Sequence, residues 1–294
     1  MKSGGSKSKE SRLRIGAFQI HFGKTMEENL EKILETISKA GRRKLDVVLF
    51  PEAATTGYAT DFRQVSSDAI RMALKRVGES AKKHRLNVLI GSPVFRGKKL
   101  FNCLVQFDRS GKVAHCYAKC QLTPSDRKVF TPGNAISLFH IDGVCATSII
   151  CHERRYPELV RLACMAGAQI LFHPNAGLDS LSVSKRKRNG NDGISIRAFE
   201  NAIYYVFANS VGPQGGGKWS AGDSKIVAPD MRVLAQADNE SESLIVGSID
   251  LDTATRKYGK ESMEYPRFLA PTWKQLVERV KRVASKSIDG FDLP

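Results

Sequence analysis

The sequence predicts an α/β protein built as one domain, and three observations carry this prediction. Short apolar runs such as Val47–Phe50 and Gln169–Phe172 alternate with stretches of helical periodicity, an order typical of crossovers onto a shared sheet. Consecutive strand-like runs between Asn87 and Tyr117 are joined only by turns, so the sheet is not purely parallel. No linker or internal repeat divides the 294 residues.

The expected elements follow one another along the chain. Leu13–Ile20 is the first expected strand, and Thr25 and Glu28 stand at capping-box spacing before the first helix, which should end near Gly41. Further helices are expected at Ser66–His84, from Pro157, at Ile194–Asn201 and at Thr272–Ala284. The other strands are expected at Val47–Phe50, Asn87–Ser92, Leu100–Asp108, Val113–Tyr117, Ala135–Ile141, from Val144 to the corner at Cys151, Gln169–Phe172, Ala202–Ala208, Ser224–Val227, Arg232–Ala235 and Ser243–Asp250.

Charge is the unusual feature of the composition. With 46 Lys and Arg against 30 Asp and Glu, the formal net charge is +16, which would suit nucleic acid, an anionic surface or an acidic partner. The densest run, Lys185–Arg188, precedes Gly and Asn residues and predicts a solvated loop. No aromatic residues interleave with it, so we do not expect nucleic-acid binding. We expect residues 1–11 to form a disordered basic arm and residues 12–294 one domain.

Cysteine usage and hydropathy indicate the compartment. No apolar run approaches the length of a membrane span, and the polar N-terminus lacks the apolar middle of a secretory signal. The six cysteines are scattered without a Cys-x-x-Cys pair, which argues against a disulfide framework or a structural zinc site. We therefore expect a cytoplasmic protein without membrane contact.

The stretch that begins at Val144 changes abruptly from an apolar strand to charged residues, and Cys151 stands at the change. Pro157 and Glu158 then suit the first turn of a helix. Unpaired backbone N–H groups at such a corner are able to lower a thiol pKa and to receive an oxyanion. Cys151 is therefore the candidate nucleophile, although a lone cysteine that ends a strand is more often part of a core.

Glu52 and Lys119 occupy comparable positions, because each follows a predicted buried strand. A carboxylate there must be paired, neutral or functional, whereas a lysine in such a position is by default a surface residue. Open α/β sheets collect active sites at strand ends. If the three side chains converge, Glu52 is suited to act as general base, Cys151 to form a thioester, and Lys119, with a backbone N–H near His152, to stabilise the oxyanion.

On these residues the chain resembles the nitrilase superfamily of carbon–nitrogen hydrolases. The resemblance extends from about Leu13 to Leu269, and it implies a four-layer α-β-β-α sandwich, a Glu–Lys–Cys triad, no cofactor and no metal. It also implies homodimers or higher homo-oligomers joined through helical faces. The matching segments, in order, are Phe50-Pro-Glu52, Tyr117-Ala-Lys119, Cys151-His-Glu-Arg-Arg-Tyr-Pro-Glu158, Arg197-Ala-Phe-Glu-Asn201, Ala208-Asn209 and Gly222 to Asp230.

Several positions depart from the family pattern or refine it. Asp126 falls where members commonly carry a second glutamate, so we expect it to orient Lys119 or the substrate. His152 stands where many nitrilases carry Trp, which favours amides over nitriles. We expect Glu153 and Arg155 to brace the corner as a pair. The residues expected to contact substrate are Tyr58, Asn175 and Arg155.

The resemblance leaves the substrate open. A linear amide is the first expectation, an N-carbamoyl amine or amino acid the second, and a nitrile the third. Charged substrates would need cations such as Arg154, Arg155 and Lys218, and Gly212–Gly217 suggests a mobile lid. Two alternatives from other classes are a catalytically silent basic protein that binds nucleic acid or another partner, and metal-dependent hydrolysis through His152, His173 and Cys164, whose spacing matches no standard ligand set.

Overall fold

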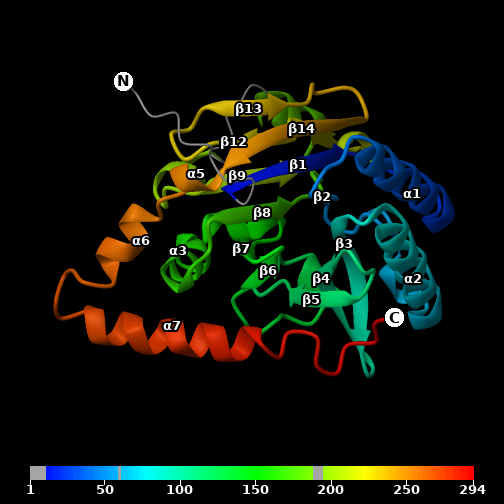
Figure 1. The fold of residues 1–294 in the computed structure, drawn as a ribbon. Helices are drawn as coiled ribbons and strands as arrows, with labels where there is room; N and C mark the ends of the chain where they lie inside the picture. The colour runs from blue at the N-terminus through cyan, green and yellow to red at the C-terminus, as the bar shows by residue number, and fades with distance from the viewer. Residues whose placement is uncertain (1–10, 59–60, 188–194) are drawn as a thin grey trace, which may run out of the picture.

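Two six-stranded β-sheets lie face to face, with helices on the outside of both, in a computed structural model that describes residues 11–58, 61–187 and 195–294 (Figure 1). This is the four-layer α-β-β-α sandwich expected from the sequence. Residues 1–10 of the expected N-terminal arm lie outside the described residues.

The first sheet is mixed, as the consecutive strands predicted. Its order is β14-β1-β2-β3-β4-β5, in which β1, β2 and β3 run parallel and the remaining neighbours are antiparallel. Helices α1 (Met26–Arg42) and α2 (Ser67–His84) cover its outer face through a large apolar cluster. The strands are β1 Arg12–Gln19, β2 Val47–Leu49, β3 Asn87–Arg96, β4 Lys99–Phe107, β5 Val113–Ala118 and β14 Ser243–Asp250.

The predicted helix starts are present at both outer helices. The Thr25 side chain accepts a hydrogen bond from the Glu28 backbone N–H, and Ser66 caps α2 in the same way through Ala69. Each cap satisfies a donor that the first helical turn leaves unpaired. These helices therefore begin where local sequence specifies it.

The second sheet has the order β13-β12-β9-β8-β7-β6, and its outer face packs against α3 (Pro157–Ala166) and α5 (Ile196–Phe199). Between β9 and β12 the chain forms a hairpin of β10 (Val211–Gly215) and β11 (Lys218–Ala221). The segment Gly212–Gly217, expected as a mobile lid, lies within this hairpin, and most of it is paired backbone. The other strands are β6 Phe139–Ile141, β7 Val144–Ser148, β8 Ile170–Pro174, β9 Tyr204–Ala208, β12 Lys225–Val227 and β13 Val233–Gln236.

The inner faces of the two sheets form one apolar core. Ile15 and Leu49 of the first sheet belong to the same buried cluster as Ile170 and Val206 of the second, and all four are fully buried. Burial on both faces explains why the central strands are nearly continuous apolar runs. The strand ends at the rim of this core are where polar side chains can meet.

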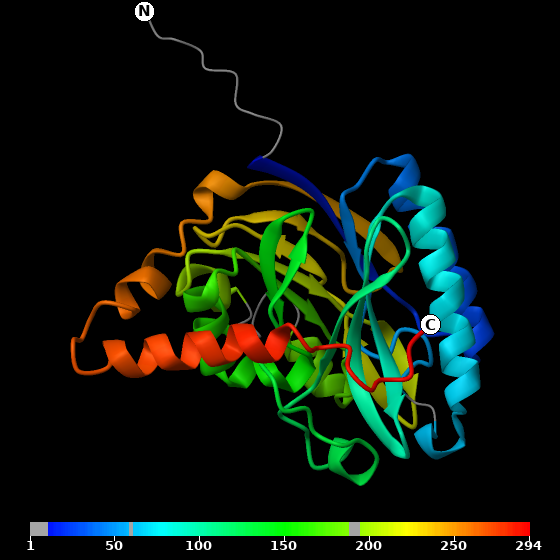
Figure 2. The same ribbon diagram turned by 60° about the horizontal axis from the view of Figure 1, so that its bottom comes forward.

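The chain ends with two helices and a return segment. Helices α6 (Lys257–Ser262) and α7 (Ala270–Ala284) follow β14, and the last residues then cross back towards β3 (Figure 2). The Asp292 backbone N–H donates to the Phe95 carbonyl at 2.8 Å, which fixes this segment against the first sheet. Among the described helices, none combines the length and the apolar content that a membrane crossing requires.

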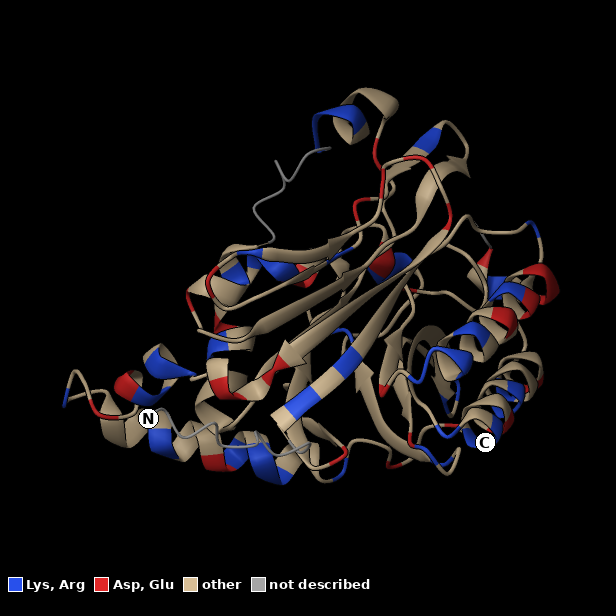
Figure 3. Ribbon diagram, turned by 45° about the horizontal axis from the view of Figure 1, so that its top comes forward, with Lys and Arg blue, Asp and Glu red and all other residues tan. Residues whose placement is uncertain are grey.

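The basic residues are spread over several elements. Lys and Arg lie on α1, α2 and α7 as well as on α4 (Leu181–Lys187) (Figure 3). The structure thus corrects the expected loop at Lys185–Arg188, since Lys185 to Lys187 form the last turn of α4, and Arg188 lies outside the described residues.

Candidate active site

The ends of three strands bring the three expected side chains to one cavity. Glu52 follows β2, Lys119 follows β5, and Cys151 follows β7, and all three line a cavity of about 300 Å³. Glu52 and Lys119 are almost fully buried, whereas Cys151 is partly accessible. Strand-end topology was the basis for expecting this meeting.

Lys119 lies between two carboxylates. Its Nζ is 2.8 Å from Glu52 Oε1 and 2.9 Å from Asp126 Oδ2. Burial opposes the charged ammonium, but nearby groups, Glu52 foremost and Asp126 among them, outweigh that cost and raise the pKa of Lys119. For Asp126, burial alone would raise the pKa, but Lys119 and the Tyr58 hydroxyl, which donates to it, hold that pKa below its ordinary value. Lys119 is therefore a fixed cation.

Glu52 is held by groups from both sheets. Its Oε1 accepts from the Asn102 side-chain amide at 2.7 Å in addition to Lys119, and its Oε2 accepts from the Ala176 backbone N–H at 3.1 Å. Asn102 is a site residue that sequence reasoning missed. The only signal was a polar residue within the apolar strand β4, whose facing direction depends on pairing register.

Cys151 is the first residue of a 3-10 turn, Cys151–Arg155, and has a left-handed φ of 49°. The α-helix begins at Pro157, as expected from the sequence. Burial, followed by the nearby Glu52, raises the pKa of Cys151 to about 12, with Lys119 opposing in part. This corrects the expectation of a lowered thiol pKa. The resting group is a neutral thiol, and its attack requires a base.

Glu153 braces the corner, but its partners differ from those expected. Its carboxylate accepts from the Tyr117 hydroxyl and from three backbone N–H groups, and Arg155 is not among these donors. The donor distances are 2.9 Å from Tyr117, 2.7 Å from Cys120, 3.0 Å from Gln121 and 2.7 Å from Ile150. The expected Glu153–Arg155 pair is therefore wrong. One buried carboxylate joins the residues after β5 to the residue before Cys151.

The cavity wall also includes the residues expected to contact substrate, Tyr58, Asn175 and Arg155, together with His152 and Arg154. The Asn175 amide N–H donates to Asn209 Oδ1 at 2.8 Å, which fixes its orientation. Lys187, from the end of α4, also lines the cavity and pairs with Asp179 at 2.6 Å. The third expected cation, Lys218, lies in β11 and is absent from the described wall, so Lys187 takes its place.

The alternative of a metal site finds no support in residues 11–58, 61–187 and 195–294, which contain no cluster of His, Cys, Asp or Glu able to hold a metal ion. His173 is buried with both ring nitrogens in hydrogen bonds, to the Tyr205 hydroxyl and to the Cys151 carbonyl at 3.0 Å. Burial lowers the pKa of His173 to about 3. Cys164 is fully buried behind the second sheet. His173 and Cys164 are therefore part of the packed interior and not of a metal site.

A four-layer sandwich that gathers a carboxylate, an ammonium and a thiol in one cavity defines a class of cysteine-dependent hydrolases. The chain belongs to the carbon–nitrogen hydrolase family, whose model matches residues 14–257.

Several characterised proteins are similar to this chain. A 2-oxoglutaramate amidase from Bacillus subtilis is 29% identical over 238 residues, covering 80% of this chain and 88% of the relative. An (R)-stereoselective amidase from a Pseudomonas species is 27% identical, covering 76% and 80% respectively. An omega-amidase from Danio rerio is 25% identical, covering 82% and 89%.

Solved structures of an amidase are also similar to this chain. An amidase from Nesterenkonia sp. AN1 superposes with a TM-score of 0.76 at 25% identity, covering 89% of this chain and 99% of the other. A variant of that amidase carries acrylamide added at its active-site cysteine, with a TM-score of 0.75, 25% identity, and coverage of 89% and 99%.

Proposed function

We propose that this protein hydrolyses a linear amide through a thioester on Cys151, with Glu52 as general base and acid and Lys119 as oxyanion stabiliser. The observation that carries the proposal is the contact of Lys119 with Glu52 and Asp126 at the wall of the cavity that also exposes the Cys151 thiol. A fixed cation beside a buried carboxylate supplies both charge stabilisation and proton transfer.

The proposed reaction has two stages. As the Cys151 sulfur attacks the amide carbon, its proton passes to Glu52, and the carbonyl oxygen becomes an oxyanion held by Lys119 and the backbone N–H of His152. Glu52 then returns the proton to the leaving nitrogen, which departs as ammonia or an amine. Water, deprotonated by Glu52, attacks the thioester, and collapse of this second intermediate releases the carboxylic acid and restores the thiol.

The cations at the cavity wall favour an acidic substrate. Arg154, Arg155 and Lys187 line the same cavity as Cys151, and Asp179 pairs only with Lys187 among them. Arginine is well suited to hold a carboxylate by paired hydrogen bonds. The names of two relatives, 2-oxoglutaramate amidase and omega-amidase, support this direction. An N-carbamoyl amino acid carries a carboxylate too, so carbamoyl hydrolysis is the second candidate.

An ammonia-release screen with matched substrates tests the proposal. We expect ω-amides that bear a carboxylate to exceed their neutral analogues in kcat/KM, and the advantage to fall in Arg154→Gln and Arg155→Gln with kcat for neutral amides retained. N-carbamoyl amino acids and nitriles complete the screen. Ammonia release from nitriles alone would contradict the amidase proposal. A protein that releases ammonia from none of these compounds would favour the catalytically silent alternative.

We also propose a homo-oligomer in a reducing cytoplasm. All six cysteines are free thiols, which supports a reducing compartment. Several large apolar side chains are exposed, notably Phe199 on α5 at 48% and, between α6 and α7, Tyr265 at 60% and Phe268 at 79%. Such residues favour a covered face. Light scattering after size exclusion should give a mass of two chains or more, and a monomer would refute this part.

A further inference from the structure

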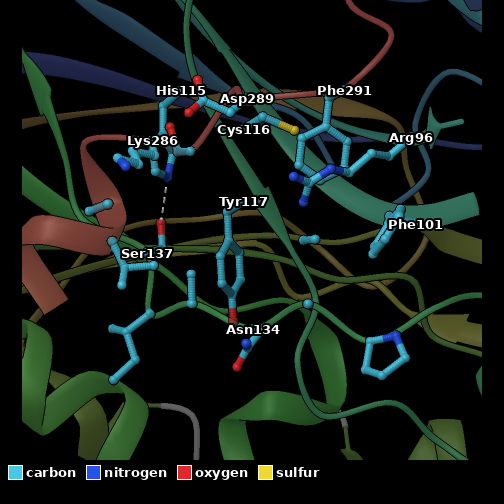
Figure 4. A pocket seen from close by; sticks show the side chains of 18 of the residues that line it. Arg96, Phe101, His115, Cys116, Tyr117, Asn134, Ser137, Lys286, Asp289 and Phe291 are labelled. Carbon is cyan, nitrogen blue, oxygen red and sulfur yellow. Dashed lines mark hydrogen bonds between the residues drawn. The ribbon is translucent and has the colours of Figure 1, made fainter. Parts of the chain in front are cut away.

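A second cavity lies away from the proposed active site. Its volume is about 530 Å³, and it is enclosed by the edge strand β5, the segment 131–137, the end of α7 and the C-terminal return segment (Figure 4). None of its lining residues lines the cavity of Cys151. The volume falls within the range of small-molecule sites, so the cavity is large enough for a metabolite.

The walls of this cavity are strongly basic. One acidic residue, Asp289, accompanies four cations in its lining: Arg96, Lys99, Arg282 and Lys286. Within the described parts of the chain, no ion pair of 4.0 Å or less engages any of these four side chains, although sixteen such pairs join other residues. Uncompensated cations around a concave surface concentrate positive potential there. A small anion in this cavity would therefore be attracted by positive charge that no ion pair within the described protein neutralises.

Contacts with the return segment orient one of these cations. The Arg96 guanidinium lies 5.6 Å from the centroid of the Phe291 ring, which packs edge-on against Phe101 at 5.3 Å. Gly290 has a left-handed φ of 74°, and a side chain there would meet Arg96 Nε at 2.9 Å. Arg96 is thus held on one wall, while Lys286 comes from the opposite wall at the end of α7 (Figure 4). This separation suits a ligand with charges at both ends.

The inner part of the cavity is polar and uncharged. His115 and Ser137 both line it, are 4% and 1% exposed, and hydrogen-bond to each other at 3.0 Å. Burial lowers the pKa of His115 to about 3, so the ring is neutral at physiological pH. A neutral imidazole and a hydroxyl in a cavity that four cations also line offer hydrogen bonds to an anion without adding repulsion.

We propose that this cavity binds a small polyanion, a metabolite with phosphate or carboxylate groups at two ends, at a site separate from the amide-hydrolysing centre. The proposal does not depend on the reaction at Cys151. Anion binding at this cavity would give a function to part of the protein's basic charge, for which the proposed catalytic mechanism has no use.

Calorimetric titration at low ionic strength, with inorganic pyrophosphate and citrate as probes, tests this proposal. We expect both probes to bind with one site per chain and acetate not to bind. Arg96→Gln/Lys286→Gln should weaken binding by about tenfold or more, because it removes two charge-assisted contacts. The control Lys75→Gln/Lys274→Gln lowers the net charge equally at exposed positions outside the cavity and should keep the affinity.

Two further variants complete the test. Asp289→Asn removes the one acidic side chain of the lining and should tighten binding by about threefold. A change of this size is typical of one exposed charge–charge contact. Arg154→Gln/Arg155→Gln should leave binding unchanged. The proposal is overturned if neither probe binds, if the control loses affinity as much as the cavity variant, or if only the Arg154 and Arg155 variant loses it, since binding would then lie at the proposed active site.

Discussion

Glu52 is the residue on which both stages of the proposed reaction depend. Because burial and Glu52 itself raise the pKa of Cys151 to about 12, the thiol needs Glu52 to accept its proton at the moment of attack. Glu52→Gln keeps a similar shape but accepts no proton. We expect kcat to fall by about a thousandfold, with an acyl-enzyme visible by intact mass if attack still occurs. Near-normal turnover by this variant would remove Glu52 from the mechanism.

Asp126 provides the second carboxylate on Lys119. Asp126→Asn should leave Lys119 paired with Glu52 but less firmly positioned, so we expect kcat to fall by up to about a hundredfold with little change in thermal stability. Steady-state kinetics measures the effect. Asp68→Asn, at an exposed position on α2, is the matched control and should behave as wild type. Unchanged kinetics in Asp126→Asn would assign the residue a packing role only.

At this scale the sequence indicated much of the site. Glu52, Lys119 and Cys151 were predicted from strand ends and motif order, and Asp126 from its place in the family pattern. Asn102 was not, because the direction of a side chain in a strand depends on a register that local sequence does not specify. The thiol pKa was also expected in the wrong direction, because the depth of burial at a corner follows from the packing of both sheets around it.

Among the elements, the turn Cys151–Arg155 has the closest link to chemistry. Glu153 lies within this turn, and its carboxylate accepts hydrogen bonds from three backbone N–H groups. Glu153→Ala would leave those donors buried without a partner. We expect the free energy of unfolding to fall by about 3 kcal/mol or more, with activity lost as the corner relaxes. Chemical denaturation and ammonia release measure the two effects.

Glu158→Ala is the control for the element, because Glu158 is exposed on the first turn of α3. It should cost at most about 1 kcal/mol through the helix dipole. If both variants lost the same stability, the bracing role assigned to Glu153 would be wrong.

Elements with strong local signals were predicted well, and some short ones were not. The capped helices α1 and α2 begin within a residue of the expected positions. The turn at Cys151 and helix α4 were missed, because one or two helical turns carry too little periodicity to stand out from a loop. The pairing of the β10–β11 hairpin was not predicted, because its glycines, which favour turns, also suit paired strands at a bulge.

For the whole molecule, two buried neutral histidines make stability depend on pH. Burial lowers the pKa of His115 and of His173 to about 3 in the folded protein. The unfolded chain binds protons at these residues below about pH 6.5, whereas the folded chain does not, so stability is lost as pH falls from that value towards 3. Each histidine contributes up to about 1.4 kcal/mol per pH unit.

Comparison with a variant isolates one of the two histidines. Between pH 7 and pH 5, the loss in the free energy of unfolding should be smaller in His115→Gln than in wild type by about 1 to 2 kcal/mol, because His173 continues to titrate. Urea denaturation at both pH values measures it. An identical loss in the two proteins would show that His115 does not remain neutral in the fold.

The overall architecture was the part of the fold that local pattern alone did not determine. Apolar runs predicted strands and a mixed sheet, but not their division into two facing sheets, since that depends on contacts between residues far apart, such as Leu49 and Phe172. The resemblance to the family supplied the four-layer arrangement. The second cavity had no sequence signal, because its cations come from the end of β3, the start of β4 and the end of α7.

The most direct test of the central claim is ammonia release by Cys151→Ala, compared with Cys145→Ala as a matched control at a half-buried thiol outside the site. With an amide that the wild type hydrolyses, we predict that Cys151→Ala releases no ammonia above background while retaining the native circular dichroism spectrum, and that Cys145→Ala remains active. Ammonia release by Cys151→Ala at the wild-type rate would contradict the thioester mechanism.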